Sequence, residues 1–159
     1  EPTLHKDLPA FCEKLKNLGY SVKIDTNGTN PDMVKSLAEN GLADYFAMDI
    51  KNDRENYAKI IGFDEYDTSK IEKSVNFFLS GGADYEFRTT LISEYHHAEN
   101  MAKISEWIRG AEKYFLQRFK SGDYCMSQNL SPVETAEAKS FADIIKPFVK
   151  SVKLRGYDI

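Results

Sequence analysis

Apolar residues along this chain recur at two periodicities, and the two patterns alternate from one end to the other. Runs rich in β-branched and aromatic residues predict strands at residues 20–25, 44–50, 84–92, 113–120 and 152–154. Apolar stripes at helical spacing predict helices at residues 7–18, 31–41, 53–62, 69–82, 99–108 and 131–147. Strands that alternate with helices favour a parallel sheet with right-handed crossovers. The predicted fold class is therefore α/β, with parallel strands and outer helices.

The first predicted helix has its apolar side chains on one face. That face is made of Leu8, Phe11, Leu15 and Leu18, at successive spacings of three, four and three residues. An amphipathic helix turns such a stripe towards the core, so we expect these side chains to be buried. Cys12 lies beside the same stripe and is expected to be a small core residue.

Three of the predicted helices carry start signals. Asn30 is expected to be an N-cap, because Pro31 suits the first helical position after it. The capping-box pattern, a serine three residues before a glutamate, occurs at residues 69–72 and 131–134. Pro147 is expected to kink or end the last turn of the third of these helices.

Composition limits the classes of function that the chain can have. Its 159 residues are 42% hydrophobic, which is enough for one sizeable core, so we expect a single domain over residues 1–159. The net charge of −4 argues against a nucleic-acid partner. No apolar run is long enough to span a membrane, and no signal-peptide pattern is found. Cys12 and Cys125 are too far apart for a metal or redox motif, which favours a reduced, cytoplasmic protein.

The histidines do not suggest a metal site. His5, His96 and His97 have no partner at a ligand spacing, and adjacent histidines at a helix entrance are expected on the surface. Cys125 lies in a polar stretch, so its thiol is expected to be more exposed than that of Cys12. It has no activating neighbour in the sequence.

Each main predicted strand carries polar residues at its end that a buried strand does not need. These residues are Asp25, Thr26 and Asn27 after the first strand, Asp49 and Lys51 after the second, Arg88 and Thr90 in the third, and Gln117 in the fourth. In a barrel or curved sheet they would converge on one concave face, where ligands bind. Carboxylates and amides suit ribose hydroxyls and an ammonium group, whereas Arg88 suits a carboxylate or a phosphate.

Each of these residues also has a purely structural explanation. Asp25 and Asn27 would cap the turn that follows them. Asp49 and Lys51, after the second strand, would be exposed to solvent. Arg88 would pair with Glu86 on the same face of its strand. Four strand ends of the same character favour a binding site, but their spacing does not identify the ligand.

Several short motifs resemble the radical S-adenosylmethionine enzymes, in particular the activases of glycyl-radical enzymes. Glu1-Pro2-Thr3 is similar to the end of their Gly-Gly-Glu-Pro motif, and their successive strand ends are matched by IDTNGT, AMDIK and FRTTL. The chain most resembles the activating proteins of anaerobic ribonucleoside-triphosphate reductase. The motifs that carry this likeness are LQRF and the closing VKLRGY. The pyruvate formate-lyase activating enzymes have a similar pattern. The resemblance spans nearly the whole chain, and the order of the motifs is its specific feature.

The resemblance implies a partial (β/α) barrel whose strand ends hold S-adenosylmethionine. It assigns Glu1 to the stretch that meets the methionine amino group, and Asp25 and Thr26 to the surroundings of the methionyl part. Asp49 and Lys51 match contacts to the ribose and its neighbouring groups. The remaining implied cofactor residues are Asn27, Arg88 and Gln117. Related activases also hold a monovalent cation in this region, which is implied here at Asp25 and Asp49.

One essential motif of that family is missing. The Cys-x-x-x-Cys-x-x-Cys motif would lie before Glu1, and its three thiolates hold a 4Fe-4S cluster that Cys12 and Cys125 cannot replace. The chain also enters a helix almost at its first residue. We therefore expect a C-terminal part of a longer enzyme, truncated at the N-terminus of the barrel and inactive alone, with the cluster only in the full-length parent.

The hypothesis that results concerns the parent protein. It would cleave S-adenosylmethionine reductively and install a glycyl radical on anaerobic ribonucleotide reductase, or on pyruvate formate-lyase or a similar enzyme. An electron donor such as flavodoxin or ferredoxin would be a second partner. Two alternatives remain: a Schiff-base or phosphate-binding barrel enzyme with Lys51 as nucleophile beside Asp49, and a non-catalytic module that docks a partner.

Overall fold

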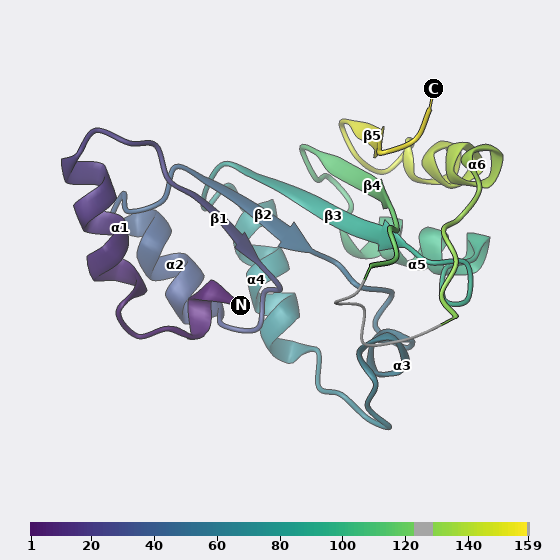
Figure 1. The fold of residues 1–159 in the computed structure, drawn as a ribbon, viewed down its shortest axis with the longest axis horizontal. Helices are drawn as coiled ribbons and strands as arrows, with labels where there is room; N and C mark the ends of the chain where they lie inside the picture. Colours follow the sequence, from purple (N-terminus) through teal and green to yellow (C-terminus); the bar gives the residue numbers. More distant parts are fainter. Residues whose placement is uncertain (123–128, 159) are drawn as a thin grey trace. The chain divides into compact units, whose positions relative to one another are not determined.

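The computed structural model describes residues 1–122 and 129–158, and the expectation for Cys125 falls outside these residues. Strands and helices alternate along the chain as predicted (Figure 1). The strands are β1 (Lys23–Thr26), β2 (Tyr45–Asp49), β3 (Tyr85–Leu91), β4 (Tyr114–Arg118) and β5 (Val152–Arg155). The helices are η1 (Pro2–Leu4), α1 (Leu8–Asn17), α2 (Pro31–Glu39), α3 (Tyr57–Ile61), α4 (Ser69–Leu79), α5 (Ala98–Trp107) and α6 (Thr135–Ile145).

The five strands form one sheet whose order, β1-β2-β3-β4-β5, follows the order of the sequence. β1 pairs with β2 in parallel and places Asp25 opposite Ala47. β4 pairs with β5 in parallel and places Gln117 opposite Arg155. Neighbouring parallel strands need a long crossover, and the intervening helices supply it. The sheet therefore confirms the predicted α/β class with parallel strands and outer helices.

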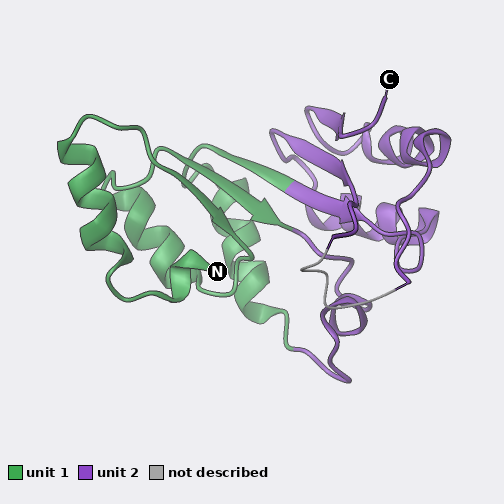
Figure 2. Cartoon of the chain, viewed as in Figure 1, with its two compact units in different colours: residues 1–49, 67–87 green, residues 50–66, 88–159 purple. Residues whose placement is uncertain are grey.

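The chain divides into two compact units (Figure 2). Unit 1 comprises residues 1–49 and 67–87, and unit 2 comprises residues 50–66 and 88–159. β3 contributes to both units, since it runs through the boundary after residue 87. Each unit has its own set of buried apolar side chains.

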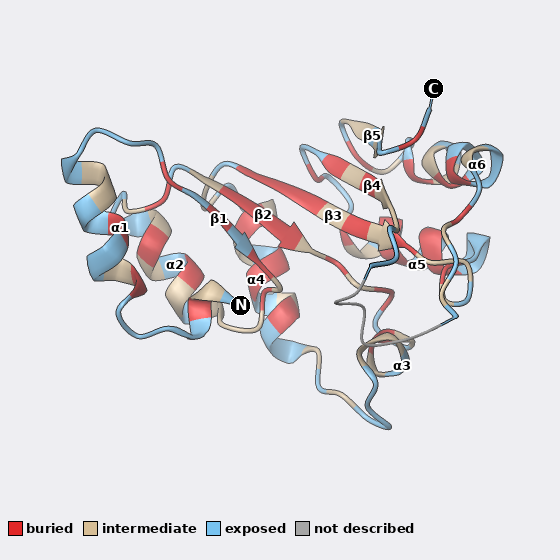
Figure 3. Cartoon of the chain, viewed as in Figure 1, coloured by how far each residue is buried: buried red, intermediate tan, exposed pale blue. Residues whose placement is uncertain are grey.

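The core of unit 1 lies between its strands and the helices that follow them. α2 packs against α4, and Val34 and Leu37 of α2 are fully buried. Phe78 of α4 places its ring centroid 5.4 Å from that of Phe46 on β2 and 5.2 Å from that of Tyr85 on β3. Figure 3 shows these buried stripes on α2, α4 and the strands. Aromatic pairs at such distances add to the stabilisation that burial itself provides.

Helix α1 buries a different face from the one predicted. Leu8 and Cys12 are 9% and 1% exposed, whereas Phe11 and Leu18 are 57% and 72% exposed. Residues four apart share one face of a helix, so Leu8 and Cys12 point together towards the core and Phe11 points elsewhere. The prediction is confirmed for Leu8 and Cys12, and it is wrong for Phe11 and Leu18. Burial raises the pKa of the Cys12 thiol.

The predicted N-cap of α2 and the predicted start of α4 at Ser69 are confirmed, but the capping box predicted for α4 is wrong. Asn30 is the N-cap of α2, and its side-chain oxygen accepts a hydrogen bond from the Met33 amide at 3.4 Å. Thr68, not Ser69, is the N-cap of α4. The amide and hydroxyl of Ser69 instead donate to Asp67, which starts a turn before the helix. This local bond competes with the capping box that the sequence suggested.

The predicted capping box of α6 is also wrong. The helix starts three residues later than expected, with Glu134 at the N-cap position. Pro132 instead forms an antiparallel bridge with Ile92. The Ser93 amide donates to Ser131 O at 2.9 Å, and the Ser93 hydroxyl donates to Pro132 O at 2.9 Å. These contacts hold the segment in an extended conformation, which delays the helix.

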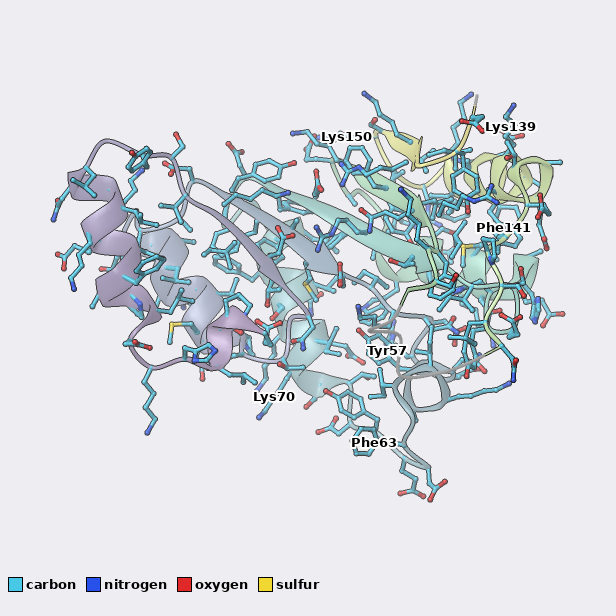
Figure 4. All side chains as sticks on the ribbon, in the orientation of Figure 1. Tyr57, Phe63, Lys70, Lys139, Phe141 and Lys150 are labelled. Carbon is cyan, nitrogen blue, oxygen red and sulfur yellow. The ribbon has the colours of Figure 1, made fainter. Side chains whose placement is uncertain are left out.

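The core of unit 2 is built from α5, α6 and the strands that they cover. α6 packs against both α5 and β5. Ile104 of α5, Tyr114 of β4, and Phe141 and Ile145 of α6 are buried (Phe141 is labelled in Figure 4). α6 ends at Ile145, ahead of Pro147, as predicted. No helix within the described part of the chain is long and apolar enough to cross a membrane.

Candidate functional site

The carboxylate of Glu1 connects the start of the chain with the end of β1. Its Oε1 accepts hydrogen bonds from the Thr26 hydroxyl at 2.9 Å and the Thr3 amide at 3.1 Å. Its Oε2 accepts a hydrogen bond from the Asn27 amide at 2.6 Å. Thr26 is 3% exposed and also accepts a hydrogen bond from the Gly28 amide at 3.1 Å. Three predicted site residues, Glu1, Thr26 and Asn27, therefore lie together in unit 1.

The Asn27 side chain closes the turn that follows β1. Its Oδ1 accepts hydrogen bonds from the amide and the hydroxyl of Thr29, at 3.0 Å and 2.7 Å. Gly28 has a φ of +77°, and a Cβ atom there would lie 2.2 Å from the Met48 methyl carbon. Only glycine fits this position. The side chain of Asn27 thus has the turn-capping role, whereas its backbone amide binds Glu1.

Asp25 and Asp49 lie on one face of the β1–β2 ladder. The Asp25 side chain is 56% exposed, and its Oδ1 is 3.5 Å from Lys23 Nζ. Asp25 is opposite Ala47, and Asp49 follows Ala47 by two residues, which places it on the same face of the sheet. Two carboxylates on one face suit hydroxyl groups or a cation.

Ile50, the residue after β2, is tied to β3 within unit 2. Its amide donates to Arg88 O at 2.7 Å, and its carbonyl accepts a hydrogen bond from the Thr89 hydroxyl at 2.6 Å. The Thr89 hydroxyl also lies 2.6 Å from that of Tyr114, whose pKa is raised by burial. Strand alternation sends the Arg88 side chain to the face opposite Thr89. The backbone that carries Arg88, a predicted site residue, is therefore fixed.

Two buried side chains hold the backbone of Lys51. The Lys51 amide donates to the Tyr57 hydroxyl at 3.4 Å, and its carbonyl oxygen lies 2.9 Å from His96 Nε2. Tyr57 packs its ring against Trp107 (Tyr57 is labelled in Figure 4). His96 is 0% exposed, so the prediction that it lies on the surface is wrong. The prediction is confirmed for His97, which is exposed.

A second buried polar cluster lies beside Lys51. Asp53 is 2% exposed and accepts hydrogen bonds from the Asn56 amide at 3.2 Å and from Asn100 Nδ2 at 2.7 Å. Burial alone would raise the pKa of Asp53, but the hydrogen bonds from Asn100 and Asn56 outweigh burial and lower it. Asn52 donates to Tyr95 O at 3.1 Å. These bonds join the segment after β2 to the segment after β3 and to α5.

Gln117, the predicted site residue on β4, is engaged by Arg155 of β5. Its side-chain oxygen accepts a hydrogen bond from Arg155 Nη1 at 3.1 Å. The Arg155 guanidinium carbon lies 3.9 Å from the centroid of the Phe115 ring, a cation–π contact. Arg155 therefore lies on the same face of the sheet as Gln117.

The predicted site residues fall into two groups. Unit 1 holds the Glu1 cluster and the carboxylates of Asp25 and Asp49, and unit 2 holds Lys51, Arg88 and Gln117. Within unit 1 the carboxylate oxygens can accept hydrogen bonds from hydroxyl or ammonium groups, and within unit 2 the cationic side chains can bind a carboxylate or a phosphate. His96, Asn52 and Asp53 were missed, although the polar run directly after a predicted strand is a signal for turn hydrogen bonds.

An iron–sulfur cluster does not fit the residues that are present. Such a cluster needs thiolates that lie close together, and the sequence has two cysteines. Cys12 is 1% exposed within α1. Among the described residues, no three His, Cys, Asp or Glu side chains are grouped so that they could hold a metal ion. The residues of this chain therefore do not hold the cluster.

Two comparisons of the sequence with known proteins identify the relatives of this chain. The sequence profile of the Radical SAM superfamily matches residues 1–109, which is more than half of the chain. A Methanocaldococcus jannaschii protein named as a glycyl-radical enzyme activating enzyme is 29% identical over 161 residues, covering 98% of this chain and 67% of that protein.

A solved structure has the same fold. It is the crystal structure of a domain of the pyruvate-formate lyase-activating enzyme from Bacteroides vulgatus, with a TM-score of 0.78 and 15% sequence identity. The match covers 98% of this chain and 94% of that domain. This likeness confirms the predicted partial (β/α) barrel.

Proposed function

Because the chain belongs to the radical S-adenosylmethionine superfamily, we propose that the complete protein binds S-adenosylmethionine and installs a glycyl radical on a partner enzyme. The observation that carries the proposal is the match, over 98% of the chain, to a protein named as a glycyl-radical enzyme activating enzyme. When bound, S-adenosylmethionine supplies the adenosyl group with which such enzymes remove a hydrogen atom from the partner's glycine.

In this proposal the residues of the chain bind and orient the cofactor. Glu1, fixed by Thr26 and Asn27, presents the start of the chain to the methionine amino group. Asp49 accepts hydrogen bonds from the ribose, and Lys51 donates to the same region. Asp25, Arg88 and Gln117 complete the binding set.

A monovalent cation is part of the proposed site. Asp25 and Asp49 share one face of the β1–β2 ladder, and carboxylate oxygens are ligands for such ions. The cation would offset the repulsion between these carboxylates and the cofactor's own carboxylate. Replacing potassium and sodium salts with choline should then weaken S-adenosylmethionine binding, and potassium or sodium should restore it.

The target that we propose is anaerobic ribonucleotide reductase. The similarity of LQRF and VKLRGY to its activating proteins supports this choice. Pyruvate formate-lyase or another glycyl-radical enzyme is the alternative target. A flavodoxin or ferredoxin would deliver the electron.

The experiment that tests the proposal uses the protein encoded by the complete gene. It is reconstituted anaerobically with iron and sulfide and reduced, and 5′-deoxyadenosine formed from S-adenosylmethionine is measured. We expect product, and less of it from Asp49→Asn than from the matched control Asp143→Asn, the same change at an exposed carboxylate of α6. A protein that assembles a cluster but forms no 5′-deoxyadenosine would contradict the proposal.

The same preparation identifies the target. Incubated with purified anaerobic ribonucleotide reductase, it should produce the paramagnetic resonance signal of a glycyl radical. A signal on pyruvate formate-lyase alone would transfer the assignment to that enzyme, and the activating function would stand.

A further inference from the structure

The backbone of Lys51 is fixed by two side chains that are removed from solvent. Its amide donates to Tyr57, which is 2% exposed, and its carbonyl faces His96, which is 0% exposed. When the backbone of a lysine is held in this way, its side chain extends from the main chain in a defined direction. Its ammonium group therefore samples fewer positions than that of a lysine in a free loop, and binding costs less conformational entropy.

The contacts of the His96 ring require one protonation state. Its Nδ1 lies 3.0 Å from the Ile92 amide nitrogen, and its Nε2 lies 2.9 Å from Lys51 O. An amide N–H can only donate, so Nδ1 accepts and the ring proton is assigned to Nε2, which donates to Lys51 O. The imidazole in this arrangement is neutral.

A second proton on the ring would disturb the arrangement. A protonated Nδ1 cannot accept the hydrogen bond from the Ile92 amide, which would lose its partner. The nearest alternative acceptor for the new N–H is Ile92 O at 3.2 Å. That oxygen already accepts the amides of Tyr95 at 3.1 Å and His96 at 2.9 Å. The hydrogen bond from Nε2 to Lys51 O does not itself require a neutral ring, but a positive charge is costly in a fully buried site. Uptake of a proton therefore favours conformations in which the ring has left the site and no longer holds Lys51 O.

The charged and titratable groups around His96 come from several elements. The carbonyl oxygens of Lys51 and Ile92 and, more weakly, the Asp53 carboxylate favour the protonated ring, whereas His97, its neighbour in the sequence, opposes it. α3 contributes the Tyr57 hydroxyl and α5 contributes the uncharged Asn100 side chain, which binds Asp53. Burial is the largest influence on the ring, and it favours the neutral form and lowers the pKa.

We propose that His96 is a positioning residue for cofactor binding, whose neutral imidazole fixes Lys51 and whose protonation weakens the binding of S-adenosylmethionine. This role rests on the proposed function, in which Lys51 contacts the cofactor. It makes affinity for S-adenosylmethionine depend on pH over the range in which a histidine gains its proton.

Calorimetric titration of the complete protein with S-adenosylmethionine, from about pH 8 to about pH 5, tests this role. The unmodified protein is expected to bind more weakly as the pH falls. His96→Gln keeps an N–H that can donate to Lys51 O but has no titratable ring. Its affinity should match that of the unmodified protein at about pH 8 and change little on acidification. His96→Leu removes the donor and should weaken binding roughly tenfold throughout.

His97→Gln is the matched control, because it removes the adjacent, exposed histidine. Its affinity and its pH dependence should equal those of the unmodified protein. Amide hydrogen exchange without any ligand gives a second measurement. The amides of Lys51 and Asn52 should exchange faster in His96→Leu than in the unmodified protein, because the segment after β2 has lost one of its anchors.

The possible results separate the two proposals. If the unmodified protein and His96→Gln bind S-adenosylmethionine with the same pH dependence, the positioning role is overturned and the proposed function stands. If the unmodified protein binds no S-adenosylmethionine at any pH, the proposed function fails and the role of His96 fails with it. Should His96→Leu not fold, the comparison with His96→Gln still decides the matter.

Discussion

Thr26 is the residue that joins the start of the chain to the end of β1. Its hydroxyl donates to Glu1 and accepts from the Gly28 amide, and the side chain is buried. A buried polar group that loses its partner costs more than the same group contributes when paired. The Glu1 cluster should therefore be sensitive to the loss of this one hydroxyl group.

Thr26→Val keeps the shape of the side chain and removes the hydroxyl. We expect the free energy of unfolding in urea to fall by roughly 1–3 kcal/mol, since two hydrogen bonds are lost. Thr90→Val is the matched control: Thr90 is a half-buried strand threonine whose side chain makes no hydrogen bond within the described residues. It should change the free energy of unfolding by less than about 0.5 kcal/mol. Equal losses at both positions would contradict the role given to the Thr26 hydroxyl.

Acid should destabilise the protein through His96 before most carboxylates take up protons. Burial lowers the pKa of His96 from its ordinary value of 6.5, so the unfolded chain binds the proton first. The contribution of His96 to the free energy of unfolding is full above that ordinary value, and it is lost as the pH falls from there through the folded-state pKa. Urea unfolding at a series of pH values should show this decline in the unmodified protein and not in His96→Gln. If the free energy of unfolding fell with pH equally in both proteins, the decline would come from groups other than His96.

At the scale of elements, α2 depends on the residue that begins it. Asn30 accepts a hydrogen bond from the Met33 amide at 3.4 Å and donates to Thr3 O at 2.6 Å, so it also holds η1. Asn30→Ala should lower the free energy of unfolding by roughly 1–2 kcal/mol. Asn40→Ala, at the exposed other end of the same helix, should change it by less than about 0.5 kcal/mol. If Asn30→Ala and Asn40→Ala lowered the free energy of unfolding by similar amounts, the loss could not be attributed to the N-cap.

The types of the elements could be predicted from the sequence, because each strand and helix has its own hydrophobic period. The capping of α4 and the start of α6 could not. At Ser69 a local hydrogen bond to Asp67 competes with the cap, and at Pro132 a bridge to Ile92 does so. The second of these contacts joins segments that are distant in the sequence. The buried face of α1 was also predicted wrongly, because the spacing of its apolar residues does not show which side of the helix packs against the core.

The places of these polar residues at the ends of strands could be predicted, because each strand has a recognisable pattern, whereas their joint role in one site stays a prediction. The support beneath them could not be predicted. His96 reaches the Lys51 carbonyl across 45 residues of sequence, and Asn100 reaches Asp53 across 47. Single-sequence patterns describe neighbours along the chain, so contacts of this kind leave no trace in them. A histidine next to another histidine therefore looked like a surface residue.

At the scale of the whole molecule, the two units are interleaved in the sequence. The chain passes from one unit to the other after residues 49, 66 and 87, and β3 contributes to both. No single cut separates one unit from the other. The single domain over residues 1–159 stays a prediction, which the course of unfolding can test.

We therefore expect the chain to unfold in one cooperative transition. Its one tryptophan, Trp107, lies in unit 2, whereas far-ultraviolet circular dichroism reports the helices of both units. Urea unfolding followed by the two signals should give the same midpoint and the same slope. The reason is that β3 has residues in both units, so the unfolding of one unit also disrupts the strand in the other. If the fluorescence of Trp107 changed at a lower urea concentration than the circular dichroism, unit 2 would unfold first. The units would then be separate domains, and the prediction of one domain would be wrong.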